Sequence, residues 1–121
     1  MSREQDYQNA LMVALSQSGR VRVWRQNAGQ VRALAGGVVK GAPVGAADLC
    51  GVVLGAGTLL QVEVKGAATP TTLEQEKWAE AVRGWGGVYA LVRARRGEAL
   101  EVFAARGCAE VLAAVDARRA A

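Results

Sequence analysis

Two nearly uninterrupted apolar stretches in the middle of the chain constrain its fold most strongly. They run from Leu49 to Leu54 and from Leu59 to Lys65, and Gly55-Ala56-Gly57 separates them. Continuous apolar runs of this length are typical of buried central strands, and the short glycine-rich segment favours a hairpin turn. We therefore expect two central strands that pair antiparallel. The glycines do not extend into a GxGxxG or Walker pattern, so no nucleotide cofactor is expected.

Helices are predicted on both sides of this strand pair along the chain. Residues 3 to 18 carry apolar side chains at helical spacing, after a capping-box pattern of Ser2 with Gln5. A second helix begins at Thr71 or Thr72, with Glu74 or Gln75 at its third position. Its apolar stripe, expected to belong to the core, consists of Trp78, Val82 and Trp85.

The remaining segments complete an α/β plan. Residues 21 to 25 alternate as a strand does, and residues 29 to 46 read as a loose hairpin or an irregular loop. Val88 to Val92 reads as a buried strand, parallel to the strand at 59 to 65 because a crossover helix joins them. After a turn at Arg95-Arg96-Gly97, we expect a short edge strand from Leu100 to Phe103 and a last helix from about Gly107. The fold class predicted is a mixed central sheet flanked by helices.

Length and composition narrow the classes of protein that this chain represents. With 121 residues, of which 51% are apolar, we expect one domain over residues 1–121 that needs neither disulfides nor a structural metal. The two cysteines, Cys50 and Cys108, lie in apolar contexts and are predicted to be buried free thiols. No stretch approaches the ~20 apolar residues of a membrane span, and the N-terminus lacks a signal peptide's apolar core. We expect a cytoplasmic protein without a membrane partner.

The chain contains no histidine. This excludes Ser-His-Asp and Cys-His nucleophiles and the usual zinc sites that include histidine. Chemistry must then rest on carboxylates, lysine, arginine, tyrosine or a hard metal ion. No acidic residue occurs between Asp6 and Asp48, whereas five basic residues do. Such a field suits a phosphate backbone, although a solvated basic face explains it equally well.

Glu63 and Lys65 are the charged residues in an otherwise apolar strand. They lie two apart, so both point to one face of the strand. An antiparallel partner that begins at Asp48 brings a second carboxylate beside Glu63. A salt bridge between Glu63 and Lys65 is the simpler explanation, but two adjacent carboxylates repel unless a cation lies between them. Oxygen ligands favour Mg²⁺ or Mn²⁺.

Asp48 followed by Glu63-Val64-Lys65 resembles the D…ExK signature of the PD-(D/E)XK nuclease superfamily. From about residue 4 to residue 92, the order and spacing of several elements are similar to the VRR-NUC domain of that superfamily. These elements are Arg25-Gln26-Asn27-Ala28-Gly29, Lys40 through Leu49, Glu63-Val64-Lys65, Thr72 through Gln75 to Trp78, and Gly86-Gly87. The resemblance implies a restriction-endonuclease-like αβββαβ core, with a strand and helix at 98–119 as an extension.

The resemblance also implies roles for individual residues. Asp48, Glu63 and the carbonyl of Val64 would hold Mg²⁺ or Mn²⁺, and Lys65 would orient or activate the attacking water. Glu4 and Gln75 match further residues near such sites, although Glu4 also suits a helix N-terminus and Gln75 a capping box. Substrate phosphate contacts would come from Arg25, Asn27 and Lys40, where Arg25 and Asn27 could instead cap a strand. Ala47 stands where the motif has proline.

The function implied is that of an endonuclease that hydrolyses phosphodiesters. Small stand-alone members of the family, from phages and bacteria, act on branched DNA such as four-way (Holliday) junctions. Symmetric cutting of such a junction requires two active sites about a two-fold axis, so a homodimer is expected. Two alternatives remain open, namely a flap or single-strand nuclease and a DNA-binding module without catalysis.

Overall fold

The computed structural model describes residues 3–26, 30–32, 36, 38–40 and 42–120. The central sheet has four strands: β1 (Val21–Arg25), β4 (Leu49–Val53), β5 (Leu59–Lys65) and β6 (Val88–Arg93), in the order β1-β4-β5-β6. β1 pairs antiparallel with β4, β4 antiparallel with β5, and β5 parallel with β6. The predicted mixed sheet is therefore confirmed, including the hairpin between the two central strands.

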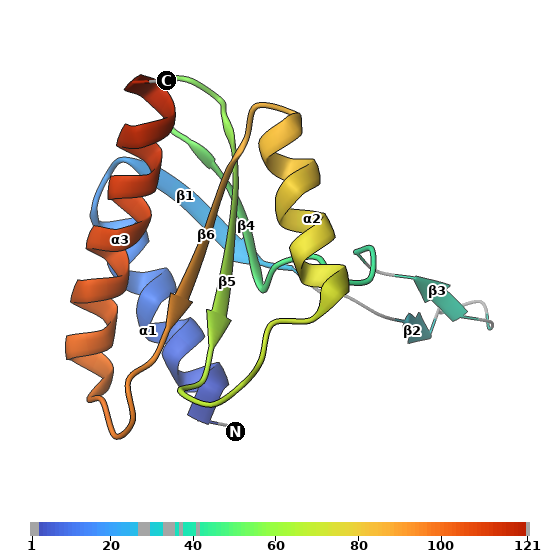
Figure 1. Ribbon diagram of the computed structural model, residues 1–121, viewed down its shortest axis with the longest axis horizontal. Helices are drawn as coiled ribbons and strands as arrows, with labels where there is room; N and C mark the ends of the chain where they lie inside the picture. The colour runs from blue at the N-terminus through green and yellow to red at the C-terminus, as the bar shows by residue number, and fades with distance from the viewer. Residues whose placement is uncertain (1–2, 27–29, 33–35, 37, 41, 121) are drawn as a thin grey trace.

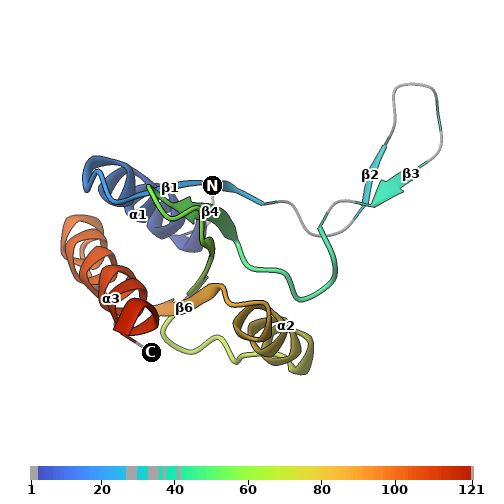
Figure 2. The ribbon, with the colours of Figure 1, turned by 90° about the horizontal axis from the view of Figure 1, so that it is seen from above.

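Three helices cover the two faces of this sheet. α1 (Arg3–Gln17) and α3 (Leu100–Ala120) pack side by side on one face, and α2 (Leu73–Gly84) lies on the other (Figure 1 and Figure 2). A short hairpin of β2 (Gln30–Arg32) and β3 (Val38–Lys40) extends from this body (Figure 2). The chain order is thus helix, strand, hairpin, two strands, helix, strand and helix.

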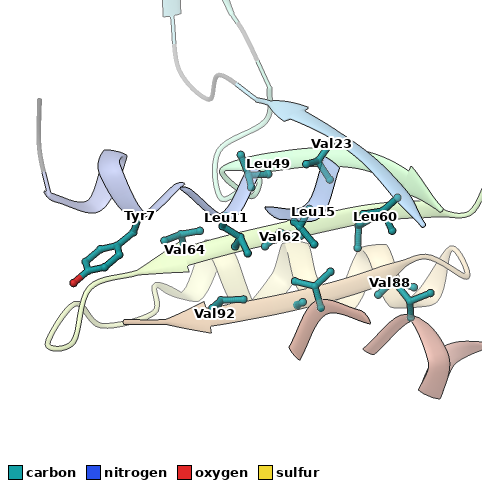
Figure 3. Close-up of a cluster of buried hydrophobic side chains, with 14 of the residues drawn as sticks. Tyr7, Leu11, Leu15, Val23, Leu49, Leu60, Val62, Val64, Val88 and Val92 are labelled. Carbon is teal, nitrogen blue, oxygen red and sulfur yellow. The ribbon is translucent and has the colours of Figure 1, made fainter. Parts of the chain in front are cut away.

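The larger core lies between the sheet and the α1/α3 layer. Tyr7, Leu11 and Leu15 recur at a spacing of four residues on α1, and all three are buried there (Figure 3). They meet the alternate apolar residues of β5, which are Leu60, Val62 and Val64. The alternation of a strand therefore leaves Gln61, Glu63 and Lys65 on the opposite face, beneath α2.

Gly107 lies at the contact of α3 with α1 and β6. Gly107 of α3 is buried, and a Cβ built at this position would lie 3.0 Å from side-chain atoms of both Leu11 and Val92. The absence of a side chain at Gly107 lets α3 approach α1 and β6 closely. This contact holds α1 and α3 together as the helical layer that covers one face of the central strands.

The C-terminal segment corrects one prediction. Residues 100–103 are the first turn of α3, not an edge strand, and the 98–119 extension therefore holds a helix alone. Phe103 is buried whereas Val102 is 54% exposed, and the buried set continues as Gly107, Val111 and Val115. This spacing of about four residues is that of a helix. The short apolar run at 100–103 also resembles a strand, which is why the start of the helix was not predicted. The turn before it forms as expected, with Gly97 at φ +70°.

The second helix begins as predicted but its apolar stripe does not stay buried. Thr72 is the N-cap and forms a capping box with Gln75. Val82 is fully buried and Trp78 half-buried, whereas Trp85 is 65% exposed, so the prediction of a core position for Trp85 is wrong. Trp85 follows the last helical residue and stacks edge-on against Trp78 from outside, with 5.6 Å between ring centroids.

Two smaller predictions are tested by the described residues. Cys50 and Cys108 are both free thiols, as predicted, but both are half-buried, so the prediction that they are buried is wrong. None of the helices in the described ranges combines the length and the apolar character that crossing a membrane requires.

Candidate active site

Asp48 lies where β4 stops pairing with β5. The last rung of the β4–β5 ladder joins Leu49 to Val62. Beyond it, Asp48 Oδ2 accepts a 2.8 Å hydrogen bond from the backbone N–H of Val64. The N–H and C=O groups of one strand residue point to the same side of the strand, so the Val64 carbonyl also faces the Asp48 side. The predicted ligands Asp48 and Val64 therefore meet.

Gln26, the residue after β1, fixes the backbone around Asp48. Its N–H donates to the Asp48 carbonyl at 2.8 Å, and its Nε2 donates to the Ala47 carbonyl at 3.1 Å. The same Nε2 donates to Gln61 Oε1 at 2.9 Å, which also accepts from Trp78 Nε1 at 2.8 Å. Gln26 was not among the predicted site residues. The structure makes it a positioning residue that ties residues 47 and 48 to β5.

The loop before Asp48 is held against α2. Gly45 has φ +89°, and a Cβ built there would lie 2.4 Å from the Glu74 carbonyl oxygen. Ala47 is 1% exposed and packs into the small core formed with Ala79 and Val82. Close packing therefore shapes the backbone at the position where the family motif has proline.

Glu63 is the most deeply buried carboxylate of the site. It is 3% exposed, and its Oε2 has no hydrogen-bond partner within the described part of the chain. The pKa of Glu63 is raised to about 9, first by burial, then by the hydrogen bond shared with Asp48 and by the charge of Asp48. Lys65 lowers this pKa, and Glu4 raises it slightly. An ionised Glu63 thus lacks a neutralising partner.

Lys65 lies on the same face of β5 as Glu63, as predicted. Its side chain is 5% exposed. In the described ranges the ammonium makes no hydrogen bond or ion pair, so the simpler reading of a Glu63–Lys65 salt bridge is not what the structure shows. Lys65 acts on Glu63 through its charge at longer range.

Glu4 and Arg25 meet Asp48 at the edge of the sheet. They line a polar hollow of about 330 Å³ together with Gln5 and Gln8. Arg25 ends β1, and its guanidinium donates to Asn9 Oδ1 of α1. The structure therefore brings Glu4 and Arg25, two predicted site residues from distant parts of the sequence, to the same hollow.

Three further predicted site residues are Gln75, Lys40 and Asn27. Gln75 Oε1 accepts from the Thr72 N–H at 3.0 Å, and the Gln75 N–H donates to Thr72 Oγ1 at 3.2 Å. Its capping alternative is therefore confirmed, and it makes no hydrogen bond to Lys65. Lys40 ends β3, which pairs with β2 in the protruding hairpin (Figure 2). Asn27 lies outside the described residues.

Tyr89 was not singled out by sequence reasoning. It lies on β6 beside Gln61, two residues from the Glu63–Leu91 pair, and its hydroxyl is buried without a hydrogen-bond partner in the described chain. Its pKa is raised to about 12, first by burial and then by the charges of Glu63 and Asp48. The alternation of residues 88–93, aligned in parallel with β5, places Tyr89 on the Glu63 face.

The donor set fits a hard divalent cation. Two carboxylates lie together, one with an orphaned buried oxygen, and a backbone carbonyl faces the same side. Within the described residues no three Cys, Asp or Glu side chains gather as a metal site, so a third protein ligand would be the Val64 carbonyl. Oxygen ligands of this kind match Mg²⁺ and Mn²⁺.

Comparisons with known proteins assign no family to this chain. No protein-family model matches the chain, and no curated protein matches it significantly. Function is therefore inferred from the site itself and from the motif resemblance.

Proposed function

We propose that this protein is a metal-dependent, structure-specific DNA endonuclease that hydrolyses phosphodiester bonds and favours four-way junctions. One observation carries the proposal. Glu63 is buried beside Asp48 with one oxygen unpartnered, and Lys65 follows on the same face. A divalent cation between the carboxylates would relieve their repulsion and give the orphaned oxygen a partner.

The order of elements supports a nuclease-like core. Without the β2–β3 hairpin and α3, the chain runs α1, β1, β4, β5, α2, β6, which is the αβββαβ order expected from the resemblance. The D…ExK residues lie at the ends of β4 and β5, the two central strands. A site at this position is rigidly backed by the core of Figure 3.

Each residue has a distinct role in the proposed reaction. Asp48, Glu63 and the Val64 carbonyl would hold Mg²⁺ or Mn²⁺, and the ion would supply positive charge that makes water more acidic and offsets charge on the phosphate. Lys65 orients the attacking water and adds positive charge where negative charge develops. Arg25, at the rim of the polar hollow, binds a phosphate oxygen of the substrate.

A panel of DNA substrates tests the proposal. The purified protein is incubated with a labelled four-way junction, a flap, a single strand and plain duplex, in Mg²⁺, Mn²⁺ or EDTA, beside Glu63→Ala. We expect symmetric nicking of the junction by a homodimer, lost in EDTA and in the variant. Cutting of flaps or single strands without cutting of the junction would show that the enzyme trims DNA and does not resolve junctions.

Absence of cutting on every substrate contradicts the nuclease proposal. DNA binding that persists without cutting would identify a binding module instead. Cleavage that survives Asp48→Ala, Glu63→Ala and Lys65→Ala would show that the reaction uses other residues.

A further inference from the structure

A second hollow adjoins the polar one on the α1 side of the site. It measures about 450 Å³ and opens where β5 and β6 end and α1 begins. Three arginines line it, Arg3, Arg95 and Arg96, together with Glu4. Glu4 also lines the hollow that contains Asp48 and Arg25, so the two hollows share a wall.

The arginines of this hollow keep their positive charge available. All three are exposed, and none forms an ion pair with a carboxylate in the described part of the chain. Arg3 donates instead to the Glu98 main-chain carbonyl at 3.1 Å and lies over the Tyr7 ring. Three cations against the one carboxylate of Glu4 give the hollow a net positive field.

The loop that carries Arg95 and Arg96 is held in place by a buried carboxylate. Glu98 Oε1 accepts from the Arg95 N–H at 2.9 Å, and the Glu98 N–H donates to the Arg95 carbonyl at 3.0 Å. The Tyr7 hydroxyl donates to the Glu98 carbonyl at 2.6 Å, which ties the loop to α1. Arg106 pairs with the Glu98 carboxylate and is its main cationic partner, and the charge of Arg95 makes a smaller contribution.

This rigid loop carries exposed arginines that form no ion pair in the described part of the chain, and it lies beside the proposed phosphodiester-cutting site. Such a surface is suited to bind a polyanion. We propose that Arg3, Arg95 and Arg96 form a second phosphate-binding site, which holds the DNA backbone next to the phosphodiester that is cut. This inference rests on the proposed function. The arginines lie beyond the residues that carry the motif, since the family resemblance ends near residue 92 and begins near residue 4.

Charge removal at the two ends of α3 provides a matched comparison. Arg95→Ala/Arg96→Ala removes two exposed cations before α3 begins. Arg118→Ala/Arg119→Ala removes two exposed cations from the last turn of the same helix, which spans 21 residues, or about 30 Å. Both double variants lower the net charge by the same amount, so only the location of the lost charge differs between them. Arg95→Lys/Arg96→Lys keeps the charge at the loop.

The experiment measures binding of a labelled four-way junction by fluorescence anisotropy, in EDTA so that no strand is cut, over a series of salt concentrations. We expect Arg95→Ala/Arg96→Ala to bind about tenfold more weakly and to reduce the salt slope by about 1–2, because each lost phosphate contact removes about 0.9 from that slope. The Arg118/Arg119 variant keeps the native slope, and the lysine variant restores most of the affinity. Thermal unfolding checks that each variant is folded.

Failure of this inference is separate from failure of the nuclease proposal. Equal losses in the two alanine variants would show a general charge effect and overturn the phosphate site. Absence of junction binding by the native protein would also overturn it. A selective loss at Arg95 and Arg96 without any cleavage by the native protein would support the site and contradict the nuclease.

Discussion

Glu98 and Glu63 are both buried, but their surroundings are opposite. Arg106 contacts both carboxylate oxygens of Glu98, with Arg106 Nη2 2.6 Å from Oε1 and Nε 2.9 Å from Oε2. The pKa of Glu98 is lowered to about 2, mainly by this hydrogen bonding. Glu63 has Asp48 as its neighbour and an oxygen without a partner, and its pKa is raised to about 9.

The difference separates a carboxylate that stabilises the fold from one that, under the proposed function, binds a cation. Glu98 organises the β6–α3 loop, and its charge is neutralised within the chain. Glu63 destabilises the metal-free protein whenever it ionises, since burial without a cation penalises the charged form. A site that tolerates this cost has a cation as its expected partner.

The largest expected effect comes from removing the cation of Glu98. Arg106→Met leaves the Glu98 carboxylate buried and unpaired, so we expect a loss of about 3–5 kcal/mol in the free energy of unfolding. Urea unfolding at pH 7 measures it. Adding Glu98→Gln to the same protein should recover part of the loss. A cost below about 1 kcal/mol for Arg106→Met would show that Glu98 does not depend on its partner.

Gly45→Ala tests the loop that sets Asp48 beside Glu63. Its positive φ and the overlap with the Glu74 carbonyl together should cost about 3 kcal/mol of unfolding free energy. Gly55→Ala is the matched control, because Gly55 has φ +87° but nothing within 4 Å of a built Cβ. We expect about 1–2 kcal/mol there. Equal costs in urea unfolding would contradict the close packing of this loop.

Metal binding should stabilise the protein through Glu63 and not through Glu98. At a hundredfold excess over its dissociation constant, Mn²⁺ should add about 2.7 kcal/mol to the unfolding free energy. Thermal unfolding with Mn²⁺ and with EDTA measures this gain. Glu63→Gln should lose it, whereas Glu98→Gln, although less stable, should keep it. A gain that persists in Glu63→Gln would place the metal elsewhere.

The pH dependence of the metal-free protein distinguishes the two glutamates further. Unfolded Glu63 loses its proton near 4.5 and folded Glu63 near 9, so stability falls as pH rises through this window. In EDTA, Glu63→Gln should match the native protein at pH 5. At pH 8.5 it should be more stable by about 1–3 kcal/mol. Parallel stability curves for the two proteins would show that Glu63 ionises without penalty.

Much of the site was predictable because it depends on local patterns. The alternation of residues 59–65 placed Glu63 and Lys65 on one face, and the glycine turn at 55–57 set the antiparallel register that brings Asp48 to them. The capping box of Thr72 and Gln75 was also visible, since it depends on a spacing of three residues.

The remaining features depend on contacts between distant segments. The bond from Gln26 to Asp48 joins segments far apart in the sequence, and the pairing of Glu98 with Arg106 connects the loop before α3 to that helix. The exposure of Trp85 follows from where α2 ends rather than from its hydropathy. The short run at 100–103 suits a strand and a helix equally, and only its burial against α1 and β6 decides between them.

Cleavage of a four-way junction by isosteric variants tests the central claim most directly. Asp48→Asn and Glu63→Gln keep the volume of each side chain and remove its charge, so folding and DNA binding should persist. With Mn²⁺ present, we predict that the native protein cuts the junction and that both variants cut below detection. Cutting by both variants at the native rate would show that Asp48 and Glu63 do not form the catalytic metal site.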